Sequence, residues 1–307
     1  MKNKAINILI SFLIFIMTCL VFIFANKTSE SFLETLMFIM VIILPSLFPF
    51  MIFINFILLS NCIDYLAIIF KPIGKIFKLS GYGISCVIAS LLGGFPYSAI
   101  LVSNFLKENK ISKQEAERLI ISTFFPSISF LFVSLNSLDE KFIYIIISLY
   151  LSSFLVLYLT SFMKRNKSNF VKEKIINVNN NFTNLYFDVM KSSFSSIFSI
   201  AFCIIFFKTI STTISYFISE DWINKIISGI LEFSSTSITI LSQTEKGFFD
   251  YLLLMNIISF SSFSIIFQSL FYLKDSKIGL KKLLFSRITI CLISSIIFMI
   301  MYALFFV

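Results

Sequence analysis

Long apolar runs alternate with short polar stretches along this chain. Many of these runs reach the roughly 20 residues that a helix needs to cross a bilayer. The pattern predicts an all-α polytopic membrane protein with about seven spanning helices plus two opposed re-entrant hairpins in an inverted repeat. The main runs cover residues 5–25, 32–60, 81–106, 142–163, 185–219, 226–243, 248–273 and 283–306.

The segment 81–106 is interrupted by Gly93-Gly94-Phe95-Pro96. Paired glycines and a proline cannot continue a helix, because glycine is too free and proline lacks an N–H. In hydrocarbon, a broken backbone is tolerated only where protein buries it or where it lines a cavity. The segment therefore predicts two half-helices, with a kinked spanning helix as the alternative. The run 226–243 is marginal for a span and suits a second hairpin.

Positive charge decides between these alternatives, because cytoplasmic loops of membrane proteins carry an excess of Lys and Arg. If both interrupted segments cross the membrane, the loops hold twelve basic residues on each side. If both return to their own side, the count becomes 20 inside and 4 outside, with Lys208 within a span. The hairpin arrangement follows. It places the loops 61–80, 107–118, 164–184 and 274–282 in the cytosol.

Opposed hairpins imply two inverted span–hairpin–span units. An echo at an offset of 135 residues aligns Gly94 with Gly229, and residues 125–132 with 260–267. The Ser112-to-Glu115 stretch has the form of a capping box that opens a helix. The predicted division is an anchor helix (1–31), a first repeat (32–135), a connecting span and linker (136–184), a second repeat (185–282) and a last span (283–307).

Composition supports a membrane protein and removes several chemistries. Hydrophobic residues make up 58% of the chain and charged residues 13%, with a net charge of +9. The basic residues lie in short loops between apolar runs, which argues against a nucleic-acid partner. There is no histidine, and the five cysteines are scattered without a Cys-x-x-Cys pair. We expect no metal, no cofactor and no enzymatic activity.

The chain resembles the YlbJ-type sporulation integral membrane proteins of the nucleoside-recognition gate domain superfamily. The resemblance rests on residues 44–50 with two prolines, Gly94-Phe95-Pro96, and residues 111–119 with their Glu-Ala-Glu-Arg-Leu block. Residues 229–232 and 263–287 look like that family's second repeat. The resemblance implies a multi-pass protein of a bacterial cell membrane, with a forespore membrane also a candidate, that moves dipicolinate.

Two departures from the family pattern concern the solute. The family's Gly-x-Pro-x-Gly-Ala-Lys becomes Gly94-Phe95-Pro96-Tyr97-Ser98-Ala99-Ile100, which loses a glycine and the lysine. The Asn-Asn pair expected after Thr123 is Phe-Phe. A lysine that would face an anionic solute is therefore missing.

Glu232 is the ionisable residue nearest a predicted hairpin tip. An intramembrane carboxylate is costly unless it is paired, so we weigh a solute or coupling-ion role against structural pairing with Lys208 or a half-helix N-terminus. For each candidate serine, a bond to its own backbone is the alternative to a bond to the solute. The amides Asn55, Asn104, Asn256 and Gln268 are read as interhelical contacts. The candidate substrate-binding residues are Gly94, Pro96, Ser98, Ser127, Ser129, Glu232, Ser235, Thr236, Ser262 and Ser264.

Two functions remain open at this stage. The first is a transporter or facilitator of a small, anionic solute by alternating access around the two hairpins, with a coupling ion as a further candidate partner. The second is a membrane scaffold or partner-binding protein of the sporulation machinery that transports nothing. Broken helices at mid-membrane favour transport, because a scaffold has no need of them.

Overall fold

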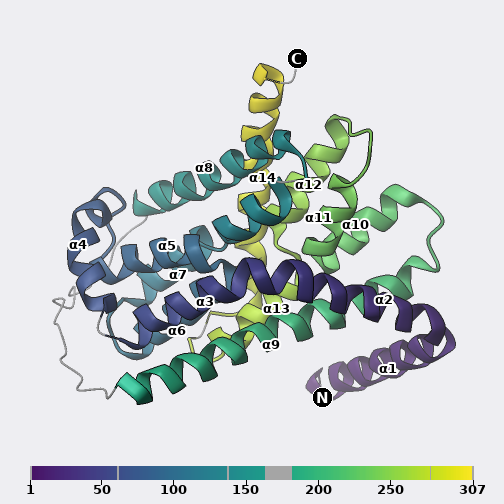
Figure 1. Ribbon diagram of the computed structural model, residues 1–307, viewed down its shortest axis with the longest axis horizontal. Helices are drawn as coiled ribbons and strands as arrows, with labels where there is room; N and C mark the ends of the chain where they lie inside the picture. Colours follow the sequence, from purple (N-terminus) through teal and green to yellow (C-terminus); the bar gives the residue numbers. More distant parts are fainter. Residues whose placement is uncertain (1, 61, 137, 163–181, 277, 306–307) are drawn as a thin grey trace.

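A computed structural model gives the fold of residues 2–60, 62–136, 138–162, 182–276 and 278–305 (Figure 1). All regular secondary structure in the described part is helical, and that part contains no strand. In chain order the elements are α1 (Lys2–Ile23), α2 (Ala25–Phe38), η1 (Ile39–Ile43), α3 (Leu44–Leu59), α4 (Cys62–Ile76), α5 (Gly81–Gly93), α6 (Phe95–Lys107), α7 (Lys113–Ser122), η2 (Phe130–Asn136), η3 (Glu140–Phe142), α8 (Ile143–Leu159), η4 (Thr160–Phe162), α9 (Phe182–Ser215), α10 (Asp221–Leu231), α11 (Phe233–Leu241), α12 (Phe248–Phe260), α13 (Ser262–Leu273) and α14 (Leu280–Phe305).

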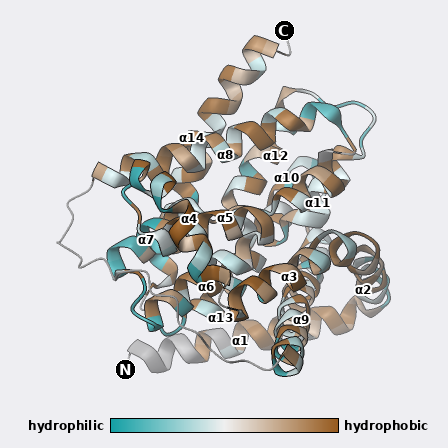
Figure 2. Ribbon diagram, turned by 60° about the vertical axis from the view of Figure 1, so that its left-hand side comes forward, coloured by the Kyte–Doolittle hydropathy of each residue, from teal (hydrophilic) through white to brown (hydrophobic). Residues whose placement is uncertain are grey.

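Five helical segments are long and apolar enough to cross a membrane, and a sixth results if the bent pair α4–α5 counts as one span. The five are Ala25–Leu59, Glu140–Phe162, Phe182–Ser215, Phe248–Leu273 and Leu280–Phe305. Figure 2 shows hydrophobic colour along these helices and hydrophilic colour gathered at the loops. On α9, the exposed Phe194, Phe198, Phe202 and Phe206 repeat every four residues and form an apolar stripe. Such a stripe is expected on a surface that faces lipid rather than water.

The helix bounds differ from the predicted segments near the N-terminus. The chain turns at Phe24, and α2 begins at Ala25, so the predicted boundary after residue 31 falls inside a helix. The polar residues that suggested a loop stay helical; Thr28, for example, returns its hydroxyl to the carbonyls of Phe24 and Ala25. The π-helical turn η1 directly precedes Pro45, which lies in the first turn of α3.

The prediction that residues 61–80 form a loop is wrong for most of their length. Residues Cys62–Ile76 form α4, which meets α5 at an angle of 95°. One side of the helix packs on the core through the buried Ile63 and Ala67, while Tyr65 and Ile69 on the other side are exposed. The linker predicted at 164–184 lies almost entirely outside the described residues, and α9 already begins at Phe182.

The predicted capping box is half present. The hydroxyl of Ser112 accepts a hydrogen bond from the N–H of Glu115 at 3.2 Å, as the N-cap of α7. The Glu115 carboxylate turns away and accepts from the N–H and the hydroxyl of Ser80, at 2.6 and 2.8 Å. Gly83 makes room for it, because a Cβ there would lie 2.2 Å from Oε1. One carboxylate thus ties α7 to the start of α5.

Polar contacts gather at two ends of the helical bundle. At one end, which we call the basic end, two ion pairs join helices that are far apart in the chain. Lys107 at the end of α6 pairs with Asp275 in the loop after α13 at 2.8 Å, and Lys282 in the first turn of α14 pairs with Glu117 of α7. Arg118 also donates to the carbonyl of Leu157 near the end of α8. The basic end therefore unites α6, α7, α8, α13 and α14.

The opposite end lies at the start of α8, roughly 25 Å away by the rise of this helix. There Asp139 accepts from the hydroxyl of Tyr251 at 2.7 Å and pairs with Lys246 at 3.3 Å. At the basic end, Asp64 has the same kinds of partner, the hydroxyl of Tyr82 at 3.0 Å and Lys110 at 3.3 Å. Each end of the bundle thus contains one Asp–Tyr–Lys cluster.

Candidate functional site

The first tip, which we define as Gly93, Gly94 and Phe95, joins α5 to α6. Gly94 has a φ of +76°, a conformation that a residue with a side chain rarely adopts. A Cβ on Gly94 would also lie 2.7 Å from the backbone N of Ser127. The predicted break is therefore confirmed, and glycine is required there both for the turn and for close contact. Pro96 follows in the first turn of α6, where a missing N–H costs nothing.

The second tip, defined as Leu231, Glu232 and Phe233, joins α10 to α11. Glu232 is extended (φ −144°, ψ 115°) and 1% exposed. Its carboxylate caps α11 and accepts four hydrogen bonds: from the N–H and hydroxyl of Ser234, and from the N–H and hydroxyl of Ser235 at 2.8 and 2.7 Å. Of the roles weighed from the sequence, this geometry is that of a carboxylate paired with a half-helix N-terminus.

The alignment of Gly94 with Gly229 does not describe where the second pair breaks. The break falls three residues later, at Glu232. Gly229 lies inside α10. A glycine is needed there for packing, because a Cβ would lie 2.3 Å from Cδ1 of Ile257. Among the described residues, no ion pair joins Glu232 to Lys208.

Two further interruptions follow the tips, and here the offset of 135 residues holds. After α7 the chain is non-helical over 124–127, and the hydroxyls of Ser127 and Ser129 lie 3.1 Å apart. Between α12 and α13, the corresponding hydroxyls of Ser262 and Ser264 lie 2.8 Å apart. Ser261 and Ser262 both have positive φ, at 71° and 51°, which is strained for residues with a side chain.

Aromatic rings join the two tips. The Phe95 and Phe233 rings, each on the first residue of its half-helix, meet edge to face with centroids 5.7 Å apart. Phe233 also contacts Phe130 at 5.8 Å, and Phe95 contacts Phe124 at 5.3 Å. Half-helices from the two predicted repeats therefore start at the same place. Figure 1 shows α13 running between the two broken pairs.

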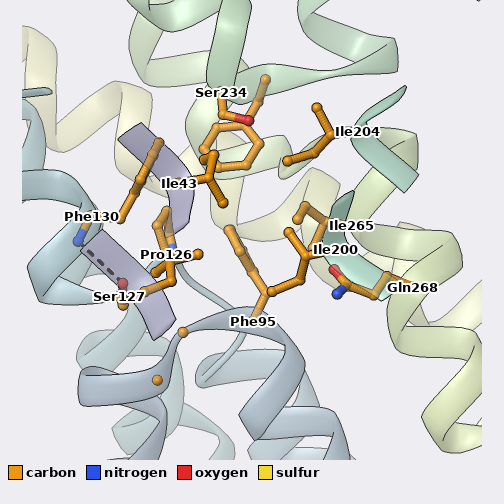
Figure 3. A pocket seen from close by; sticks show the side chains of 14 residues that line it. Ile43, Phe95, Pro126, Ser127, Phe130, Ile200, Ile204, Ser234, Ile265 and Gln268 are labelled. Carbon is orange, nitrogen blue, oxygen red and sulfur yellow. Dashed lines mark hydrogen bonds between the residues drawn. The ribbon is translucent and has the colours of Figure 1, made fainter. Parts of the chain in front are cut away.

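A cavity of about 40 Å³ lies where these elements meet (Figure 3). That volume holds a few water molecules, since one water needs roughly 10–15 Å³ by the same measure. The lining is apolar apart from Ser127, Ser234 and Gln268. The lining residues are Ile43, Leu47, Gly93, Gly94, Phe95, Pro126, Ser127, Phe130, Ile200, Ile204, Phe233, Ser234, Ile265 and Gln268.

The cavity includes two of the predicted site residues, Gly94 and Ser127. Ser98 instead bonds the hydroxyl of Thr123 at 2.8 Å and joins α6 to the end of α7. Thr236 returns its hydroxyl to the carbonyl of Glu232 at 2.9 Å. Pro96 lies in the first turn of α6, directly after the first tip. The predicted residues outside the described lining are Ser98, Ser129, Glu232, Ser235, Thr236, Ser262 and Ser264.

Arg287 is the main polar residue of this region that the sequence reasoning placed wrongly. The charge count includes it among the 20 cytosolic basic residues, but it lies in the second turn of α14 and is fully buried. Its guanidinium donates to the carbonyls of Phe124 and Ile121, the latter at 2.9 Å, and stacks on the Phe124 ring at 4.8 Å. It thereby satisfies carbonyls at the C-terminal end of α7, a position that favours a cation.

Metal binding has no support in the described part of the chain, where no cluster of three His, Cys, Asp or Glu side chains occurs. No protein-family model, curated protein or solved structure matches the chain. The fold and its apolar helices define an all-helical, multi-pass membrane protein, whose described residues form no strand.

Proposed function

We propose that this protein is a transporter or facilitator of a small solute, and that the solute passes between the two tips. The observation that carries the proposal is convergence: both tips and the interruption after α7 line one cavity, together with α13, which begins at the fourth interruption. Broken helices with their ends at a shared central site are the usual architecture of solute sites in secondary transporters.

The contacts at the two ends support re-entrant hairpins rather than two more spans. If 81–106 crossed the membrane, Asp64 and Lys110 would lie on opposite sides; they lie 3.3 Å apart. Likewise Lys107, the last residue of α6, contacts Asp275 of the basic end at 2.8 Å, so α6 ends on the side where α5 begins. For α10 and α11, Lys246 meets Asp139 at the end where α8 begins. In our proposal, α5–α6 enters from the basic end and α10–α11 from the other.

The proposed topology has seven spans, two more than the five long helices. The additional two are α1, which contains most of the apolar run 5–25, and α7 together with η2, which are separated by the non-helical residues 124–127. The excess of Lys and Arg at the basic end would place that end in the cytosol.

The small cavity supports a closed conformation, in which the solute site is collapsed between the tips. The resemblance predicts an anionic, dipicolinate-like solute and a sporulation role in the cell membrane. The described lining carries no cationic side chain, and Arg287 is occupied by carbonyls. An acceptor oxygen on the solute would instead meet the N-terminus of α6, where Gly94 supplies no side-chain cap.

The test is flux into proteoliposomes that contain the purified full-length chain. Radiolabelled dipicolinate, benzoate and benzamide would serve as probes of different charge. We expect saturable uptake of at least one probe above protein-free liposomes, and a loss of at least tenfold in Gly94→Ala. Gly279→Ala is the matched control, because nothing lies within 4 Å of a Cβ there. Absence of uptake for all three probes would favour the scaffold, and uptake unchanged by Gly94→Ala would overturn the proposed path.

A further inference from the structure

The four amides that the sequence places in apolar runs have different environments. Asn55 donates to a tyrosine and a serine hydroxyl on two other helices, at 2.9 Å each. Asn256 bonds its own helix and accepts from two side chains of α14. Asn104 is exposed. Gln268 alone among them is 1% exposed with neither amide atom bonded.

A buried amide without hydrogen-bond partners lowers the stability of the folded protein. Burying such a group without compensating hydrogen bonds costs about 1–3 kcal/mol in protein mutational data. The side chain has an unused donor, Nε2, and an unused acceptor, Oε1. It lies on α13 and lines the central cavity, with its amide end toward Phe95 and Ile200 in Figure 3. The cavity therefore contains a polar group that no described residue satisfies.

The two tips differ in what they offer to the same cavity. At the second tip, Glu232 already caps α11 with its carboxylate. At the first tip, α6 begins after Gly94 without a side-chain cap. Pro96 has no N–H, and the N–H groups of Tyr97 and Ser98 donate to the Gly94 carbonyl, so the Phe95 N–H is the one left for a solute among residues 95–98. The rest of the lining is mainly apolar, including Ile204, Phe130 and Phe233, and the hydroxyls of Ser127 and Ser234 are already bonded to Ser129 and Glu232. The site thus combines an apolar body with one donor–acceptor pair and a weakly positive helix end.

We infer that Gln268 recognises an uncharged, amide-like edge on the transported solute. Nε2 donates to a carbonyl oxygen of the solute, and Oε1 accepts from the neighbouring N–H. The aromatic or aliphatic remainder of the solute packs among the phenylalanine and isoleucine side chains. A carboxylate would use Nε2 but leave its other oxygen facing Oε1, and two acceptors repel. The inference rests on the proposed function, because it names the solute class for the same cavity.

The matching experiment is equilibrium binding of radiolabelled benzamide and benzoate to the purified full-length protein in detergent. Benzamide carries the donor–acceptor edge on an apolar ring, and benzoate has the same shape with a charge. We expect saturable benzamide binding, at least tenfold tighter than benzoate. Gln268→Met, which keeps the length and removes both polar atoms, should weaken benzamide binding at least tenfold.

Thermal melting separates recognition from a structural role. Gln268→Met should melt at the same or a higher temperature, because it removes an unsatisfied amide. Asn256→Leu, the control, should melt at a lower temperature because it leaves partners unpaired. If the Met variant does not fold, Gln268→Asn keeps an amide withdrawn by one methylene and should weaken benzamide binding at least threefold.

The inference is overturned if benzamide binding is not saturable, if benzoate binds as tightly, or if the Gln268 variant that folds binds benzamide as the unchanged protein does. The outcomes also separate this inference from transport. Gln268-dependent benzamide binding without flux of any probe would overturn transport and keep the recognition site. Gly94-dependent dipicolinate flux without a preference for benzamide would keep transport and overturn the recognition site.

Discussion

The two tips reach the same place in the fold by opposite chemistry. At the first tip, the chain turns because Gly94 has no side chain: its φ is +76° and the backbone of Ser127 lies against it. At the second tip, the chain turns because Glu232 has a side chain that holds the four donors at the start of α11. The comparison shows that the second tip is capped by its own carboxylate, whereas the first tip has no side-chain cap and leaves only the Phe95 N–H without a described acceptor among residues 95–98.

The largest loss of thermal stability and of flux should come from adding a side chain at the first tip. In Gly94→Ala the backbone conformation alone, at φ +76° and ψ −160°, costs about 1–3 kcal/mol. The clash with the Ser127 backbone adds to this, because backbone cannot move aside as a side chain does. We expect the melting temperature to fall well below that of Gly279→Ala, and flux to be lost. Equal melting of the two variants would contradict the close contact between Gly94 and Ser127.

The next largest loss of thermal stability is expected from replacing Arg287, which donates to the carbonyls next to the first tip. Arg287→Met should leave the carbonyls of Ile121 and Phe124 without their donor, at about 1–3 kcal/mol for each unsatisfied group. Phe124 packs on Phe95, so the first tip should loosen as well. Lys281→Met removes an exposed cation from the same helix and should melt as the unchanged protein does. A melting temperature unchanged in Arg287→Met would refute the capping role.

A smaller effect is expected at the second tip. Glu232→Gln keeps the shape but offers one acceptor oxygen in place of two, and loss of an N-cap costs about 0.5–2 kcal/mol. We expect lower thermal stability with an unaltered pH profile of flux. Glu245→Gln, at an exposed position in the loop beyond the other end of α11, is the control. A tenfold loss of flux at unchanged stability would instead assign Glu232 to solute or coupling-ion binding.

The smallest effect concerns the Asp–Tyr–Lys cluster beside the second broken pair. Burial acts to raise the pKa of Asp139, but hydrogen bonds from Tyr251, the Lys141 N–H and Lys246 outweigh it, so the pKa falls below its ordinary value of 3.8. The folded pKa is therefore below the unfolded one. The resulting stabilisation is present above about pH 4 and is lost as pH falls through the folded value.

Melting measured from pH 6 down to pH 3 would test this cluster. Asp139→Asn should flatten the acid-side loss of stability by about 1 kcal/mol or less, the range for one ion pair that is not deeply buried. Asp188→Asn, at an exposed position on α9, should leave the pH dependence unchanged. The same acid-side loss in Asp139→Asn and in the unchanged protein would show that the cluster contributes nothing there.

The first tip could be predicted from the sequence because glycine and proline act locally on the backbone. The second could be located only to within three residues. Its break depends on a carboxylate that folds back on Ser234 and Ser235, and an acidic residue in an apolar run does not reveal that geometry. Gly229 misled the alignment because a glycine can equally serve helix packing, here against Ile257.

Two residues of the site could not be read from the sequence at all. Arg287 follows a basic loop and looks like a flanking charge, and its partners lie more than 160 positions away at the end of α7. Gln268 resembles any amide in a membrane helix, which most often bonds a neighbouring helix. That its partners are missing is a property of packing around the cavity, which no local pattern encodes.

The central claim is that the two broken pairs are hairpins that enter from opposite faces. Single cysteines at Lys113 and Glu245, both exposed positions, would be placed in a chain lacking its five native cysteines and labelled in intact cells with an impermeant maleimide. We expect the cysteine at 245 to be labelled and the one at 113 to react only after the membrane is permeabilised. Labelling at 113 in intact cells, or the same accessibility at both positions, would contradict the opposed hairpins.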